Sequence, residues 1–148
     1  MSYYMGRQNF TPAAADTALH VLASATTRGG LCEFVIGSDA TPVEQSGEYQ
    51  IIRTTTTGTT PAGNTTVVKV NSFSPGAACT FGGGGYTTEP TPGDVLMDVP
   101  VHQKATFRWV AYPGRELMST PAASAGIGMV VVGQSAAFSI NTSCMWLE

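Results

Sequence analysis

Charged side chains are scarce in this sequence. Of its 148 residues, 11% are Asp, Glu, Lys or Arg, where soluble domains carry roughly 25%. The length predicts one domain, which can bury a core without needing a metal or a disulfide. Because Thr, Ser and Gly must then cover much of the surface, we expect a partner to cover part of it.

Clustered cations, long apolar runs and paired cysteines are missing too. The seven Lys and Arg are spread along a chain of net charge −3, so no basic stripe can neutralise phosphates and no nucleic-acid partner is expected. No apolar run is long enough to span a membrane, and the first residues lack the apolar stretch of a secretion signal. This predicts no membrane partner and synthesis in a cytoplasm. Cys32, Cys79 and Cys144 have no paired spacing and are interpreted as free, partly buried thiols.

Residues that could carry chemistry are few. His20 and His102 are the only imidazoles, and a metal site would need Asp98 or Glu33 to complete it. Histidines on strands without a carboxylate partner are expected at the surface. The four glycines at 82–85 lack the Lys of a phosphate-binding loop, and Gly-x-Ser-x-Gly is absent. We therefore predict no catalytic, cofactor-binding or metal-binding residues, and no enzyme.

The clearest structural pattern lies at residues 105–112. One set of side chains alternates with the other: Ala105, Phe107, Trp109 and Ala111 against Thr106, Arg108 and Tyr112. A period of two predicts a half-buried strand. Pro113-Gly114 predicts a turn, and residues 127–132 form the next strand. Arg108 is expected to form a salt bridge with Glu116 across this turn rather than to stack on its aromatic neighbours.

Similar alternation predicts strands at residues 17–24, 31–36, 48–55, 66–71, 94–101 and 136–147. A helix over 12–25 is the alternative for the first of these. A Thr-rich hairpin at 54–64 is expected to join two of the strands, and residues 72–93 are expected to be a long loop. Val95, Met97 and Val99 should share one face. About nine short strands predict an all-β, single-domain β-sandwich resembling a jelly roll.

Residues 1–16 are interpreted as an extended N-terminal arm before a β-sandwich domain at 17–148. Several large side chains in this segment suit either an arm that docks on a partner or a first edge strand lying on its own domain. The predicted partner contacts are Tyr3, Tyr4, Met5, Arg7 and Phe10. Core support beneath the contact surface is expected from Phe107, Trp109, Phe138 and Trp146.

A family resemblance covers roughly residues 17–148. The run Lys104-Ala-Thr-Phe-Arg-Trp-Val-Ala-Tyr-Pro-Gly-Arg-Glu-Leu117 is similar to a recurring pattern in small virion-associated proteins of tailed bacteriophages. The same pattern includes residues 34–42, 49–55, 88–91, 121–123 and 126–128, and a closing strand that ends in an acidic residue, Glu148. The chain departs from the pattern at 82–85 and in its first 16 residues, which are therefore expected to set a particular contact.

The resemblance implies a structural protein of the virion, a head decoration (cement) protein on the capsid exterior. Its implied partners are the major capsid protein and further copies of itself, with a homotrimer favoured from the class alone. Two alternatives stay open. One is a phage tail, neck or receptor-binding component. The other is a small cupin-like or carbohydrate-binding β domain that uses His20 or His102.

Overall fold

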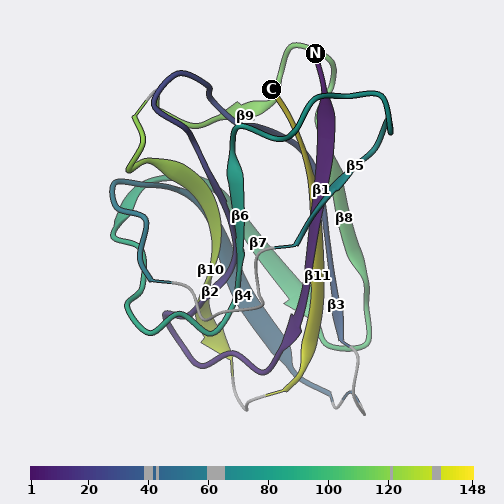
Figure 1. Ribbon diagram of the computed structural model, residues 1–148. Coiled ribbons are helices and arrows are strands. Elements are labelled where there is room, and N and C mark those ends of the chain that lie inside the picture. Colours follow the sequence, from purple (N-terminus) through teal and green to yellow (C-terminus); the bar gives the residue numbers. More distant parts are fainter. Residues whose placement is uncertain (39–41, 43, 60–65, 121, 135–137) are drawn as a thin grey trace.

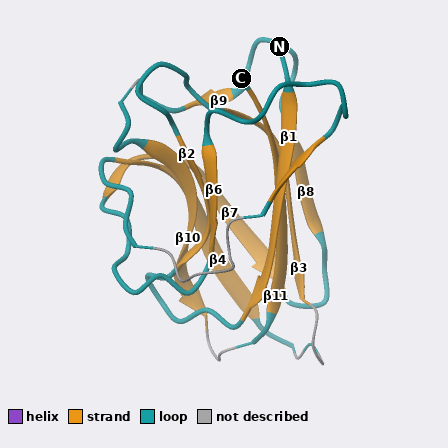
Figure 2. Cartoon of the chain, viewed as in Figure 1, coloured by secondary structure: helices purple, strands orange, loops and turns teal. Residues whose placement is uncertain are grey.

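Two antiparallel β-sheets pack face to face in the computed structural model of the chain (Figure 1). The structure describes residues 1–38, 42, 44–59, 66–120, 122–134 and 138–148, and these ranges contain eleven strands and no helix (Figure 2). Sheet A has the order β5 (Val67–Lys69), β1 (Tyr3–Phe10), β11 (Ile140–Leu147), β3 (Gly30–Ser38) and β8 (Phe107–Val110), and β9 (Leu117–Met118) also pairs with β3. Sheet B has the order β6 (Thr80–Gly83), β2 (Thr17–Leu22), β10 (Gly126–Gln134), β4 (Ser46–Thr54) and β7 (Pro92–His102).

The predicted β-sandwich is therefore confirmed, including the strand rather than the helix after residue 16. Eight of the eleven strands correspond to the strands predicted above; β6 and β9 are additional, as is β1, whose segment was left open between an arm and a strand. Along the described ranges there is no helix of the length and apolarity that a membrane crossing requires. Of the strand predicted at 136–147, residues 136 and 137 lie outside the described residues.

Aromatic side chains from both sheets fill the core. Trp146 is fully buried and lies between Tyr4, whose ring centroid is 6.0 Å away, and Phe81, at 6.2 Å with nearly parallel rings. Aromatic contacts of this kind add to the stabilisation that burial itself provides. Phe107, Trp109 and Phe138 are partly buried and pack against this core. Phe107 and Trp109 lie on β8, at the opposite edge of sheet A from β1 and β5, so their predicted place beneath a contact surface stays a prediction.

Strand β1 lies inside sheet A, between β5 and β11, so residues 3–10 belong to the sandwich itself (Figure 1). Of the two interpretations of this segment, the structure is nearer the one in which it lies on its own domain, but β1 is an inner strand of sheet A and not the edge strand of that interpretation. Ser2 and Glu148 exchange two backbone hydrogen bonds of 3.0 and 3.1 Å. The two ends of the chain consequently lie side by side at one end of the sheet.

The Thr-rich hairpin is a wrong prediction. Strand β5 pairs with β1 in sheet A, whereas β4 lies in sheet B, so the chain crosses between the sheets instead of returning beside β4. The run of Thr residues has a high strand propensity but contains no information about the partner strand. The predicted hairpin tip at residues 60–64 lies outside the described residues.

The long loop predicted at 72–93 contains strand β6, which includes Gly82 and Gly83. Glycine serves close packing between the sheets here. A Cβ on Gly84 would lie 2.3 Å from Cζ of Phe10, and a Cβ on Gly6 would lie 2.4 Å from Cδ2 of Phe81. The two phenylalanines thus occupy the space that side chains at these glycines would need.

A β-bulge changes the facing of β7. The register between β4 and β7 shifts after Ile51, which pairs with Met97, while Ile52 pairs with Val95. An extra residue on one strand reverses the facing of the residues beyond it. Val95 is 51% exposed, whereas Val99 is fully buried, so the prediction that they share a face is wrong.

Candidate interaction surface

An apolar patch lies on the outer face of sheet A, across its first two strands. Tyr3, Met5, Val68 and Val70 form it, and their exposed fractions are 40, 43, 56 and 52%. The register places Met5 beside Val68, and the Val70 N–H donates to the Tyr3 carbonyl at 3.0 Å. The four side chains therefore share one face. We call them the β1–β5 patch.

The surroundings of the patch are apolar on one side and cationic on the other. Met145, partly buried, is the partner of Met5 on β11, and Phe73, 95% exposed, follows β5 in the chain. Arg7 is exposed two residues beyond Met5, and none of the ion pairs among the described residues involves it. Contiguous exposed apolar side chains with a polar border are typical of interaction sites.

The structure separates the five predicted contacts into two groups. Tyr3, Met5 and Arg7 lie on the outer face, where a partner can reach them. Tyr4 is only 1% exposed, and its hydroxyl donates to the Pro75 carbonyl at 3.0 Å, so it is a core residue and its predicted role as a contact is wrong. Phe10 is half-buried and packs against the core.

At the opposite edge of sheet A, Arg108 forms an ion pair with a different partner from the one predicted. Arg108 Nε donates to Glu33 Oε1 at 2.7 Å, because β8 pairs with β3 and brings these residues to the same outer face. The Glu33 carboxylate holds the pKa of Arg108 above its usual value. Glu116, the predicted partner, instead accepts a hydrogen bond from the Gly114 N–H at 3.0 Å. Gly114 has φ +80°, as expected for the predicted turn.

His20 is buried, although a surface position was predicted. It is fully excluded from solvent on β2, and its Nε2 lies 2.7 Å from Thr54 Oγ1, while its Nδ1 has no hydrogen-bond partner among the described residues. Burial lowers the pKa of His20 to about 4. The ring of Tyr86 lies over it at a centroid distance of 6.2 Å, and burial also raises the pKa of Tyr86.

The other groups considered for chemistry are dispersed. His102 lies at the end of β7, where Nε2 is 3.6 Å from Glu44 Oε2. Within the part of the chain that the structure describes, no three His, Cys, Asp or Glu side chains gather as a metal site would require. The three cysteines are free and buried, and burial raises the pKa of Cys32 to about 11 and those of Cys79 and Cys144 to about 12. All three are thiols near neutral pH.

Sequence reasoning missed Val68 and Val70 as surface residues of interest. Both lie in a strand that was predicted at 66–71. The alternation of side chains there separates two faces of the strand but does not determine which face is exposed. The deciding fact is that β5 pairs with β1 at the edge of sheet A, which no local signal contains.

Fold and surface together define an antiparallel β-sandwich with few charges and an exposed apolar patch at one edge of one sheet. No protein family, curated protein or solved structure matches the chain.

Proposed function

We propose that this protein is a non-enzymatic structural protein of a bacteriophage virion, and that it decorates the outside of the assembled head. Two lines support the proposal. One is the resemblance over residues 17–148 to small virion-associated proteins. The other is the β1–β5 patch, which offers a sandwich of this kind a surface for a neighbouring subunit.

The patch is the observation that carries the proposal. Permanent interfaces are more apolar than ordinary surface and favour aromatic residues, Met and Arg while disfavouring Lys and Glu. Tyr3 and Met5 lie in the patch and Arg7 beside it. Because Arg7 forms none of the ion pairs among the described residues, its guanidinium group can bind a carboxylate or carbonyl of the capsid protein.

Decoration would stabilise the head by mass action. A protein that binds the assembled lattice better than loose subunits shifts the equilibrium towards the assembled state. Repeated contacts around the lattice would add avidity. In this proposal the copies on the lattice associate with each other, with a trimer favoured. The molar mass of the purified protein by light scattering tests that part separately.

The central test is binding to purified heads. Deleting residues 2–10 would remove a strand from inside sheet A, so point variants are the sharper choice. We expect Val68→Glu to lower head occupancy at least roughly tenfold, because an unpaired carboxylate in a desolvated interface costs well over the 1.4 kcal/mol that a factor of ten requires.

The matched control is Val95→Glu on β7, since Val95 is 51% exposed against 56% for Val68 but lies in sheet B. It should leave occupancy unchanged. Equal occupancy of both variants would reject the patch as the capsid contact. Imaging of labelled particles decides the location: many copies on the head support decoration, and label confined to the tail or neck contradicts it.

A further inference from the structure

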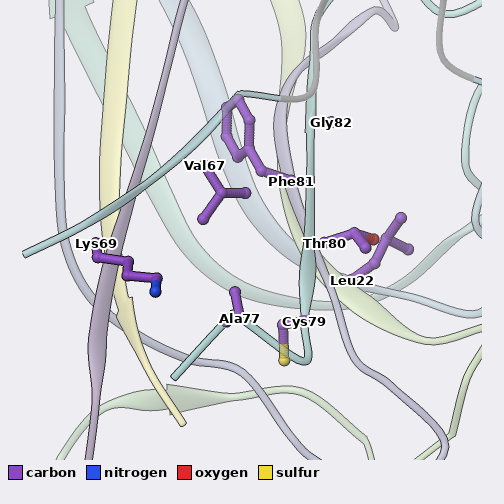
Figure 3. A pocket seen from close by; sticks show the side chains of 9 residues that line it. Leu22, Val67, Lys69, Ala77, Cys79, Thr80, Phe81 and Gly82 are labelled. Carbon is purple, nitrogen blue, oxygen red and sulfur yellow. The ribbon is translucent and has the colours of Figure 1, made fainter. Parts of the chain in front are cut away.

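An open cleft of about 630 Å³ lies where the two sheets end, between the edge strands β5 and β6 (Figure 3). Val67, Ala77 and Phe81 contribute apolar groups to it, and Lys69 contributes its side chain from β5. Leu22 and Thr80 line it on the far side of β6. The cleft therefore follows the free edge of β6 and has side chains on both faces of that edge.

On the side of β6 that faces away from β2, the backbone pairs with no other strand in the part of the chain that the structure describes. The Ala23 N–H, directly after β2, donates to the Ala125 carbonyl, so the alternate residues that precede it on β2, Val21 and Leu19, bond to β10, and the residues between them bond to β6. His20 and Leu22 are the ones that pair towards β6, with Gly82 and Thr80. The N–H and C=O groups of Phe81 and Gly83 consequently point away from the sheet.

Cys79, two residues before Phe81, shows that a backbone group at this edge can form a hydrogen bond outside the sheet. The Cys79 N–H, which has the same orientation as that of Phe81, donates to Glu148 Oε1 at 2.9 Å. Among the described residues, no side chain and no backbone group forms a hydrogen bond with the outward-pointing N–H or C=O group of Phe81. An edge strand with unpaired backbone groups is a template for a further strand.

Lys69 indicates the chemistry of that strand. It projects from β5 into the cleft, and none of the ion pairs among the described residues involves it. An extended occupant along β6 would place alternate side chains on its two faces. The side chains that face β5 would meet Val67 and the Lys69 ammonium group. This favours an apolar residue and a carboxylate two positions apart, on the same face of the added strand.

We propose that β6 binds an extended segment of another polypeptide by strand addition, with its backbone paired to Phe81 and with apolar and acidic side chains in the cleft. Main-chain hydrogen bonds give such a complex its affinity, and the pockets for alternate side chains give it specificity. The proposal uses neither the β1–β5 patch nor the identity of the partner, so it is independent of the proposed function.

The test uses the full chain and a capped peptide, acetyl-Thr-Val-Thr-Asp-Thr-Val-amide, as the probe, because it places Val and Asp on the same face of an extended strand. Two further peptides carry N-methyl groups on either the odd or the even residues. Only alternate amides of an added strand face its partner. We therefore expect one methylated peptide to bind as the parent does and the other to lose binding, with the Phe81 amide shifted and protected from exchange in NMR spectra.

Charge recognition has its own control. Replacing Asp by Asn in the peptide should weaken its binding to the wild type roughly fivefold, as expected for a partly exposed ion pair. The Lys69→Met variant should bind the Asp and Asn peptides with equal affinity. Lys104→Met, at a distant surface lysine, should bind like the wild type.

Three results would overturn the proposal. One is the absence of any Phe81 shift at about 1 mM peptide, a concentration that detects dissociation constants up to about 1 mM. Another is equal binding of both methylated peptides. The third is protection of Phe81 that rises with protein concentration alone, because the occupant would then be a second copy of this chain.

Discussion

Protonation of His20 should govern much of the acid sensitivity of this protein. Its ring is fully buried on β2, with Thr54 Oγ1 2.7 Å from Nε2 and no partner for Nδ1 among the described residues. Burial disfavours the charged form, so the pKa falls from 6.5 to about 4 in the folded state. Folding therefore requires a neutral imidazole.

The sign and size of the effect depend on the two pKa values. Above pH 6.5 the ring is neutral whether the chain is folded or unfolded, and it costs nothing. Below pH 6.5 His20 is protonated in the unfolded chain, whereas in the folded chain it becomes protonated only near pH 4. The free energy of unfolding therefore decreases as the pH falls from 6.5 to about 4. At pH 4.5 the loss amounts to about 2–3 kcal/mol, on the scale of 1.36 kcal/mol per pKa unit.

The assay is urea unfolding at pH 7.0 and 4.5 of the wild type and of His20→Gln, which cannot be protonated. Carboxylates contribute to the pH dependence of both proteins, so the quantity of interest is the difference between their two pH-induced changes in unfolding free energy. We expect the wild type to lose about 2–3 kcal/mol more than the variant. Equal losses in the two proteins would refute the reasoning, as would an NMR titration in which His20 becomes protonated near pH 6.5.

Other predictions concern packing, the closing residue of β11 and the thiols. Gly6→Ala should destabilise the fold by about 1–3 kcal/mol, because the new Cβ would meet the Phe81 ring. Gly76→Ala should change the urea midpoint little, because an added Cβ there would have no atom of the described residues within 4 Å apart from its chain neighbours. Glu148→Ala should cost about 1–3 kcal/mol, since its carboxylate accepts two backbone N–H groups and an indole N–H; an unchanged midpoint would contradict this role. The three buried thiols should react with a disulfide reagent only as fast as the protein unfolds, and rapid labelling of the native protein would show that they are accessible.

The amino-acid sequence by itself determined the elements of this protein. Alternating side chains predict the strands around Phe107 and Trp109 and around Cys144 and Trp146, and Gly114 predicts its turn, because strand periodicity and turn conformation depend on neighbouring residues only. The class of fold can be inferred from the number of such strands.

Only the tertiary structure decided which strands are neighbours and what each face meets. Pairing between strands far apart in the sequence places β5 beside β1 and thereby creates the β1–β5 patch. The same long-range pairing gives Arg108 its partner Glu33, and a bulge turns Val95 outward. His20 is a similar case: its strand was predictable, but its burial depends on segments that fold over sheet B from elsewhere in the chain. Such contacts depend on the free energy of packing the whole core, so they cannot be inferred from a short segment of the sequence.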